Sequence, residues 1–292
     1  MAHLHKLGFI STIFIDDTLL IASSELECIR NVKASLQLFE RLGFAVHHVK
    51  SVLTPFHSIT YIGFILNSVD MTITLTDENK VKFQSFAPQL LKEGVCSVRT
   101  LAKFIVQAVA SFHGVMYGPL WYRALEKDKM QGLRQGNGVY DSLVLLSEEA
   151  KTELQWWKDN ILSSYGLIYI SHGKPDFVLF SDTSLTGWGC SSEHGRTGGH
   201  WNSTEVAVSI NALELKARLF ASQVFASDKC SLHVCLMMDN TTAVACVNKM
   251  GTSHSDPCHG IPKQILELYI AGNLRISAAY VPGVENSCRR EV

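Results

Sequence analysis

The sequence predicts an α/β and α+β protein in which a mainly helical segment separates two sheet-containing parts. The chain has 292 residues, of which 47% are apolar, and this is enough for about two domains at roughly 150 residues each. Short apolar runs bounded by turn residues dominate the first part, and helical periodicity dominates the middle. Strands and helices alternate in the last part, which indicates a mixed sheet with helices on its faces.

Two apolar runs open the chain, residues 9–15 and 18–22, with Asp16 and Asp17 between them. Apolar runs on either side of polar turn residues predict a β-hairpin, here with two acids at its turn. An adjacent pair of aspartates at a turn is, taken alone, more often structural than catalytic.

A helix is expected after this hairpin. Ser24 and Glu27 form a capping-box pattern, apolar residues then recur at helical spacing, and Gly43 marks the end of the helix. Three short apolar segments beyond Gly43 predict strands. These segments are residues 45–48, 59–66 and 71–75.

Residues 76–160 have helical periodicity, and three candidate N-caps divide them into separate helices. The candidate caps are Thr76, Ser97 and Ser147. Three glycines within residues 131–138 predict a loop. The adjacent Trp156 and Trp157 are expected to pack in the protein rather than to stack on bases.

The whole chain is nearly neutral, with 26 basic and 27 acidic side chains, which excludes a globally basic nucleic-acid-binding protein. Residues 80–134 are an exception, because they contain nine basic residues and three acids. Solvated helix faces and a surface that follows phosphates are both consistent with this charge. The second explanation requires neighbours that handle nucleic acid. The nine basic residues are Lys80, Lys82, Lys92, Arg99, Lys103, Arg123, Lys127, Lys129 and Arg134.

The pattern changes after residue 171, and we expect a domain boundary within residues 165–175. The expected strands are residues 177–181, 187–191, 197–201, 233–238 and 274–281. The expected helices are residues 211–226, 241–249 and 261–271. Asp182 and Asp239 each follow a strand, and Glu214 lies one turn into the first helix. Ligands gather at strand ends in such sheets, so we expect these three carboxylates to converge.

Converging carboxylates repel one another unless cations lie between them. Two Mg²⁺ ions about 4 Å apart would activate a water and stabilise the leaving oxygen of a phosphodiester. Each acid also has a structural explanation. Asp182 would start a turn, and Glu214 would form a capping pair with Asn211. Asp239 and Asn240 would cap the following helix.

Short motifs surround these acids. They are Ser-Asp-Thr-Ser at 181–184, Gly-Trp-Gly at 187–189, Gly-Gly-His-Trp at 198–201, Glu205, Ile-Asn-Ala-Leu-Glu-Leu at 210–215, Asp-Asn-Thr-Thr-Ala-Val at 239–244 and Pro-Gly-Val-Glu-Asn at 282–286. Together they resemble the ribonuclease H domain of reverse-transcribing retroelements, with the DIRS-type (tyrosine-recombinase) retrotransposons as the nearest pattern. The resemblance implies that Asp182, Glu214 and Asp239 bind two Mg²⁺ ions and that Asn240 contacts nucleic acid.

The positions after Asn286 depart from that pattern. In such elements an Ala-Asp pair follows, and its Asp is the fourth metal-binding carboxylate. This chain has Arg289 and Arg290 in those places, with Glu291 one position later. A cation beside a dinuclear metal site weakens metal binding by like-charge repulsion, so we expect nuclease activity to be weak or absent.

Asp16 and Asp17 complete an aromatic-x-Asp-Asp sequence that resembles the signature of the reverse transcriptase palm. Leu-Gly-Phe at 42–44, Lys50 and Tyr-Ile-Gly-Phe at 61–64 follow in the order of the later palm motifs. The resemblance implies that the two aspartates bind the metal ions that hold an incoming nucleotide, and that Lys50 lies near this nucleotide.

Over the whole chain, the resemblance implies a partial reverse transcriptase palm at 1–75, a helical thumb and connection at 76–170, and a ribonuclease H-like domain at 171–292. We expect the chain to be truncated at both ends, so that it does not synthesise DNA alone. The expected partner is an RNA–DNA hybrid or a template–primer duplex. The alternative is a catalytically inactive nucleic-acid-binding remnant of a retrotransposon.

Other classes of protein fit less well. The sequence has no stretch of about 18 apolar residues that would indicate a membrane span. Its eight cysteines form no C-x-x-C pair, which favours free thiols in a reducing compartment, the cytoplasm or the nucleus. A zinc site built from Cys246, His254, Cys258 and His259 would match no strong ligand spacing.

Overall fold

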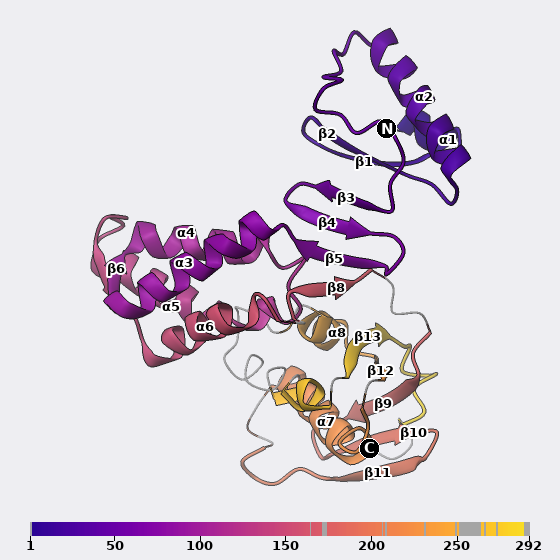
Figure 1. The fold of residues 1–292 in the computed structure, drawn as a ribbon. Coiled ribbons are helices and arrows are strands. Elements are labelled where there is room, and N and C mark those ends of the chain that lie inside the picture. The colour runs from indigo at the N-terminus through magenta and orange to yellow at the C-terminus, as the bar shows by residue number, and fades with distance from the viewer. Residues whose placement is uncertain are drawn as a thin grey trace.

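The computed structural model describes residues 2–163, 165–170, 174–205, 207, 209–230, 232–248, 250, 264–265, 267–272 and 274–288. The fold is mixed α/β with several sheets, as the sequence predicts. Figure 1 shows the N-terminal strands and helices at one end, a group of helices to one side, and the C-terminal sheet with its helices at the other end. Within the described residues, no helix has both the length and the apolar character that crossing a bilayer requires.

The predicted N-terminal hairpin is present, and two helices lie beside it. The elements are α1 (Ala2–Lys6), β1 (Ile10–Phe14), β2 (Asp17–Ile21) and α2 (Glu25–Arg41). Ser24 caps α2 by accepting a hydrogen bond from the Glu27 N–H, as the capping-box pattern predicts. The side-chain amide of Asn31 donates to the carbonyl of Ile10, which ties α2 to β1.

A second, antiparallel sheet has the order β3-β4-β5-β8. Its strands are β3 (Ser58–Tyr61), β4 (Phe64–Asn67), β5 (Thr72–Leu75) and β8 (Leu167–Tyr169). The prediction of one strand over residues 59–66 is wrong, because the chain reverses between β3 and β4. Ile62 and Gly63 both have positive φ, 44° and 84°, which is the backbone geometry of a tight hairpin turn.

Residues 45–48 form no strand, in contrast to the prediction. The His47 carbonyl accepts hydrogen bonds from the N–H groups of Lys50 and Ser51, at 3.0 and 3.1 Å. This local bonding forms a turn and uses backbone groups that a strand would pair with a neighbour. Lys50 is exposed in the turn.

Residues 76–160, all of them described, fold mainly as helices, as predicted. The elements are α3 (Asp77–Glu93), β6 (Val95–Ser97), α4 (Val98–Ala110), the 3₁₀ helix η1 (Gly118–Leu120), α5 (Arg123–Gln135), β7 (Leu143–Leu145) and α6 (Glu148–Asn160). Ser97 and Ser147 cap α4 and α6 by accepting hydrogen bonds from the N–H groups of Thr100 and Ala150. Thr76 occupies the cap position of α3 but makes no side-chain capping bond.

The loop predicted at 131–138 starts later than expected, because α5 continues to Gln135. Gly132 lies inside this helix, where a Cβ atom would meet Val98 at 2.8 Å and Val144 at 3.0 Å. The glycine therefore permits close packing of α5 against α4 and β7. This packing offsets the cost of a glycine in a helix, about 1 kcal/mol relative to alanine.

The core of the helical unit is built around Trp157, and the expectation that this tryptophan packs is confirmed. Its side chain is fully buried and stacks on Phe83, with 4.7 Å between the ring centroids. Phe104 meets the ring edge-on at 6.5 Å. The indole N–H donates to the carbonyl of Trp121 at 2.7 Å, which satisfies the polar atom of the ring.

Replacing Trp157 with alanine is expected to lower the free energy of unfolding by about 3–5 kcal/mol, because the change leaves a cavity in a packed core. Urea denaturation followed by circular dichroism measures this. Lys158→Ala, at an exposed position of the same helix, is the matched control and should change the free energy by less than about 0.5 kcal/mol. Similar values for the two variants would show that Trp157 does not stabilise the unit through its packing.

The C-terminal sheet has the strand order β11-β10-β9-β12-β13 among the described residues. Its strands are β9 (Phe177–Thr183), β10 (Gly187–Ser192), β11 (Gly195–His200), β12 (His233–Met238) and β13 (Arg275–Tyr280). Strands β9 to β11 pair antiparallel, whereas β9, β12 and β13 run parallel. Two helices pack on this sheet, α7 (Ile210–Phe225) on β9 and β10 and α8 (Thr241–Asn248) on β12 and β13. The strand bounds agree with the predicted ones to within two residues.

The C-terminal sheet contacts the helical unit through an apolar cluster. Tyr117 and Leu120 are buried in it, and Ile270 and Ile276 from the C-terminal part pack against them. The Tyr117 hydroxyl donates to the carbonyl of Leu274 at 3.3 Å, and burial raises the pKa of Tyr117 to about 12. This contact links the sheet to the helices.

Candidate metal-binding carboxylate site

Asp182, Glu214 and Asp239 come together at one edge of the C-terminal sheet. Asp182 lies near the end of β9, Asp239 directly follows β12, and Glu214 extends from α7. Strands β9 and β12 are parallel neighbours, so their ends lie at the same edge. One carboxylate oxygen from each residue lies within 4.8 Å of those of the other two. The expectation that the three carboxylates converge is therefore confirmed.

The carboxylate of Asp182 does not begin a turn. Asp182 is still paired in the sheet, opposite Gly189 of β10, and its Oδ1 accepts a hydrogen bond from the Thr183 N–H at 2.8 Å. The turn follows at Ser184, whose hydroxyl accepts from the Gly187 N–H. The structural explanation for Asp182 is thus wrong, and β9 holds this carboxylate in the cluster.

Glu214 does not form a capping pair with Asn211. The N-cap of α7 is Ser209, whose hydroxyl accepts a hydrogen bond from the Ala212 N–H. Glu214 is therefore beyond the first turn, and its side chain is buried with the other two acids rather than folded back on the helix end.

Asp239 is not the N-cap of α8; the next residue, Asn240, is. The side-chain oxygen of Asn240 accepts from the Ala243 N–H at 3.0 Å, as an N-cap does. The side-chain nitrogen of Asn240 donates to the side-chain oxygen of Asn211 at 2.9 Å. Asn240 therefore joins the starts of α7 and α8 next to the carboxylate cluster.

The electrostatics of the site centre on Glu214. Burial raises the pKa of Glu214, and the charges of Asp239 and Asp182 raise it further, while Arg218 opposes the shift as an ion-pair and hydrogen-bond partner. Sequence reasoning does not single out Arg218. The signal that could have found it is its spacing of four residues from Glu214 on one helix, which places both side chains on the same face.

The hairpin of β1 and β2, which carries Asp16 and Asp17, lies at the opposite end of the molecule from β9 and β12 of the C-terminal sheet (Figure 1). Asp16 is exposed at the turn, and Asp17 pairs with Phe14 at the start of β2. Ile15 makes the turn with a φ of 56°, and the Tyr61 hydroxyl donates to the Asp17 carbonyl at 3.3 Å. Among the described residues, no further acid, histidine or cysteine joins this pair in a group that could hold a metal ion.

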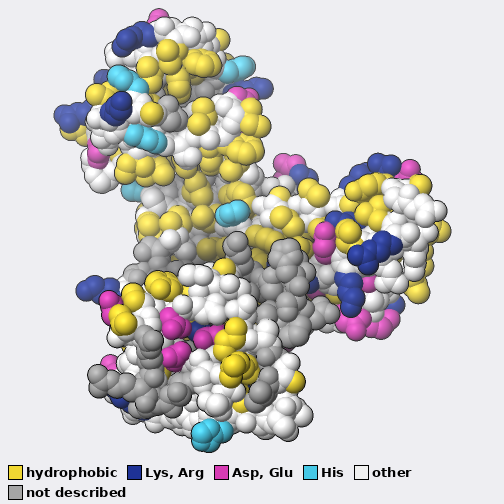
Figure 2. Space-filling model, turned by 180° about the vertical axis from the view of Figure 1, so that it is seen from behind, with side chains coloured by type: hydrophobic (Ala, Val, Ile, Leu, Met, Phe, Trp, Pro, Cys, Tyr) yellow, Lys and Arg dark blue, Asp and Glu magenta, His cyan; other side chains and the backbone are white. Residues whose placement is uncertain are grey.

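The hairpin also exposes apolar side chains. Phe14 is 57% and Ile15 82% exposed, and Figure 2 shows apolar side chains over the surface of the N-terminal unit. Strands β1 and β2 pair only with each other among the described strands. A two-stranded ribbon is marginally stable by itself, so the hairpin is a weak platform for rigidly placed carboxylates.

Eight of the nine basic residues of segment 80–134 fall into two groups. The ninth, Arg123, is half-buried, and its guanidinium lies over the Tyr122 ring, 4.3 Å from the ring centroid. The first group forms ion pairs, which are Lys80 with Asp77, Lys82 with Glu78, Arg99 with Asp141 and Lys129 with Glu126. The second group is exposed and makes no ion pair with any residue that the structure describes. Its members are Lys92, Lys103, Lys127 and Arg134. The first group resembles solvated helix faces, and the second leaves positive charge available to phosphates.

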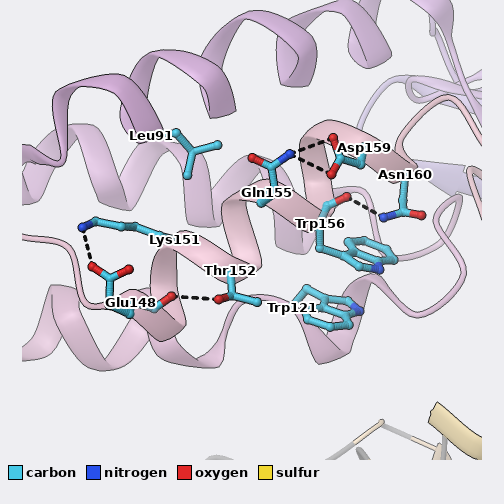
Figure 3. Close-up of a pocket in the computed structure, with 9 residues that line it drawn as sticks. All are labelled: Leu91, Trp121, Glu148, Lys151, Thr152, Gln155, Trp156, Asp159 and Asn160. Carbon is cyan, nitrogen blue, oxygen red and sulfur yellow. Dashed lines mark hydrogen bonds and ion pairs between the residues drawn. The ribbon is translucent and has the colours of Figure 1, made fainter.

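An open pocket of about 480 Å³ lies along α6 (Figure 3). Trp121 and Trp156 stack against each other in its wall, with 5.3 Å between the ring centroids. Leu91 of α3 and polar side chains of α6 line the rest, and several of these polar side chains bond with one another. The bonded pairs are Lys151 with Glu148 and Gln155 with Asp159. Trp156 therefore packs on Trp121 at the edge of the pocket, as expected from the sequence.

The segment after β13 returns to the sheet beside Asp182. The buried side-chain nitrogen of Asn286 donates to the carbonyl of Ser181 at 2.9 Å, and the thiol of Cys288 lies 3.1 Å from the hydroxyl of Ser191. Several predicted residues lie outside the described part of the chain. They are Arg289, Arg290 and Glu291, the zinc candidates His254, Cys258 and His259, and the side chain of Cys246.

No protein-family model and no curated protein matches the chain. Among solved structures, it is similar to the dRH form of the foamy viral protease–reverse transcriptase in complex with double-stranded DNA, with a TM-score of 0.47 and 14% identity over 96% of this chain and 47% of that one. The same viral protein in complex with an RNA/DNA hybrid gives a TM-score of 0.47 and 12% identity over 95% of this chain and 36% of that one. Ribonuclease H1 from the halophilic archaeon Halobacterium salinarum gives a TM-score of 0.31 and 15% identity over 39% of this chain and 89% of that one. The chain thus spans about half or less of these two viral chains.

Proposed function

We propose that the C-terminal part of this chain is a ribonuclease H-like domain that binds divalent cations and cleaves the RNA strand of RNA–DNA hybrids weakly. The observation that carries the proposal is the convergence of Asp182, Glu214 and Asp239 within 4.8 Å. The donors fit magnesium, because Mg²⁺ prefers hard carboxylate oxygens. Their mutual repulsion in a buried position also favours a bound cation.

The three carboxylates have distinct tasks in this proposal. Asp182 and Asp239, fixed by neighbouring strand ends, hold the cation at the edge of the sheet, and Glu214 contacts it from α7. When bound, the metal supplies an activated water and stabilises the leaving oxygen of the phosphodiester. Asn240 connects the start of α8 to the start of α7 by its hydrogen bond to Asn211. We propose that Asn240 also contacts the nucleic acid next to the site.

We further propose that the chain derives from a reverse transcriptase–ribonuclease H polyprotein of a DIRS-type retrotransposon. In this proposal residues 1–75 are a partial palm, residues 76–170 a thumb and connection, and residues 171–292 the ribonuclease H-like domain. Asp16 and Asp17 would be metal-binding acids of the palm and Lys50 a contact of the nucleotide. The exposure of Asp16 and Asp17 in a two-stranded hairpin agrees with the expectation that this chain does not synthesise DNA alone.

A catalytically inactive nucleic-acid-binding remnant is the second candidate function. The observation that favours it is the ion pair between Arg218 and Glu214, because a cation is already present beside the carboxylates. Incubation with a 5′-labelled RNA strand, annealed to DNA, in Mg²⁺ separates the two candidates. Cleavage that EDTA stops supports the nuclease. Hybrid binding without cleavage and without Mn²⁺ binding supports the remnant, and no binding of either ligand contradicts both.

Hybrid binding should depend on the unpaired basic residues of the helical unit. Lys103→Glu is expected to weaken binding and to reduce the slope of log K against log salt by about 0.9, since each neutralised phosphate contributes that amount on duplex DNA. Lys82→Glu is the matched control, because Lys82 already pairs with Glu78 at 3.1 Å. Fluorescence anisotropy at several salt concentrations measures both. A flat salt response of the unmodified chain would rule out this surface, as would unchanged affinity after reversal of Lys80, Lys82 and Lys103 together.

A further inference from the structure

The residue that distinguishes this carboxylate cluster is Arg218. It lies one helical turn after Glu214 on α7, and its side chain is 0% exposed. Its guanidinium forms an ion pair with the Glu214 carboxylate and also donates to the Glu214 backbone carbonyl. A fully buried arginine is rare and costly unless it is paired.

The other N–H groups of the Arg218 guanidinium indicate that this side chain acts through its charge rather than through hydrogen bonds. Its Nε and Nη2 are buried and make no hydrogen bond with any residue in the described part of the chain. The guanidinium is therefore incompletely satisfied by hydrogen bonds. What stabilises it there is the negative charge of Glu214, with Asp182 and Asp239 close by.

The formal charges set a limit on the cations that the site accepts. Three ionised carboxylates carry three negative charges, and Arg218 supplies one positive charge beside them. The balance of two negative charges matches one divalent cation. A second divalent cation would leave an excess of positive charge in a poorly solvated position, which is unfavourable at low effective dielectric constant.

We infer that Arg218 is a positioning residue that takes the electrostatic place of a second metal ion, so that the described carboxylates hold one divalent cation rather than two. The inference rests on the proposed function, because it assumes that the cluster binds a divalent cation at all. Arg218 also holds Glu214 in place when no metal is bound, because its charge reduces the repulsion among the three acids.

Counting bound Mn²⁺ in the full chain, by calorimetry and by electron paramagnetic resonance of the free ion, tests this. The unmodified chain is expected to bind one Mn²⁺ at the cluster, and Asp182→Asn should remove it. Arg218→Met, which keeps an unbranched side chain without its charge, is expected to bind a second Mn²⁺ or to bind the first at least roughly tenfold more tightly. Arg218→Lys should retain the behaviour of the unmodified chain. Arg196→Met, at an exposed position of β11, removes the same charge elsewhere and should change nothing.

The outcomes separate the inference from the proposed function. Two ions per unmodified chain, both lost in Asp182→Asn, overturn the inference and leave the proposed function intact. Equal stoichiometry and affinity in Arg218→Met and the unmodified chain overturn it as well. If Arg218→Met does not fold, the count in the unmodified chain and in Arg218→Lys decides. Binding by Arg218→Met alone would show that Arg218 excludes every divalent cation, which overturns the count of one and contradicts the proposed function of the unmodified chain. Binding by neither contradicts both.

Discussion

Replacing Asp182 with asparagine is expected to abolish divalent-cation binding at the C-terminal sheet, with a loss of affinity of about 100-fold or more. Changes in residues that merely support a metal ligand already cost 10- to 100-fold, and Asp182 would be a ligand itself. Asparagine keeps the size of the side chain and an oxygen that can accept the hydrogen bond from Thr183. The change therefore removes charge with little effect on packing. Calorimetric titration with Mn²⁺ measures the loss.

The thermal stability of Asp182→Asn is a second measurement. In the absence of metal, the variant is expected to be at least as stable as the unmodified chain, although it binds metal more weakly. Without metal, Asp182→Asn relieves repulsion from Glu214 and Asp239, so its thermal midpoint in EDTA should equal or exceed that of the unmodified chain. With Mg²⁺ the unmodified chain should gain stability and the variant should not, because only the cation-binding form is stabilised by mass action. Asp228→Asn, an exposed acid of the same unit, is the control for loss of one negative charge. An unchanged Mn²⁺ affinity in Asp182→Asn would place the cation elsewhere in the chain.

The C-terminal sheet could be predicted closely because its signals are local. Strands β9 and β12 are short apolar runs that lead into an aspartate, and β12 matches its predicted range of 233–238 without error. The parallel arrangement of β9 and β12 follows from the element order, because two antiparallel reversals (β10 and β11) and the crossover through α7 lie between them. It brings Asp182 and Asp239 to the same edge. Convergence of the acids was thus open to prediction from element order alone.

Reversals of the backbone within an apolar segment, and close packing of side chains against a glycine, could not be predicted from the sequence in the same way. The apolar segment at residues 59–66 looks like one strand. Ile62 has a positive φ, which is rare for a β-branched residue and which its residue type does not predict. The glycines after residue 131 look like a loop, but Gly132 is in a helix because Val98 and Val144 approach it from distant parts of the chain. The second error comes from tertiary contacts that outweigh a local preference, whereas the first comes from a two-residue hairpin turn between β3 and β4.

The role of Arg218 is hidden for a related reason. Arginine is mostly exposed in proteins, so an arginine in a helix with apolar neighbours reads as a surface residue. Only the structure shows that α7 is buried on the face that carries both Glu214 and Arg218. The charge of the site is therefore a property of the folded chain, and a search for acids in the sequence overestimates its negative charge by one unit.

Arg290→Asp, combined with Arg289→Ala, is expected to raise the affinity for divalent cations by at least roughly tenfold and to create or increase Mg²⁺-dependent cleavage of the RNA strand of a hybrid. The resemblance places an aspartate at position 290, and the change replaces a positive with a negative charge there. With Arg218 retained, four carboxylates and one guanidinium give a balance of three negative charges, which accommodates a second divalent cation better than two negative charges do.

The last described residues of the chain lie beside β9 and β10. Asn286 is fixed to Ser181, the residue before Asp182, and Cys288 lies against β10. Cleavage of the labelled RNA strand by the double variant, by the unmodified chain and by the double variant with Asp182→Asn measures the effect, and the last should be inactive. Robust cleavage by the unmodified chain, with two Mg²⁺ ions bound, would show instead that another acid such as Glu291 already supplies the fourth ligand.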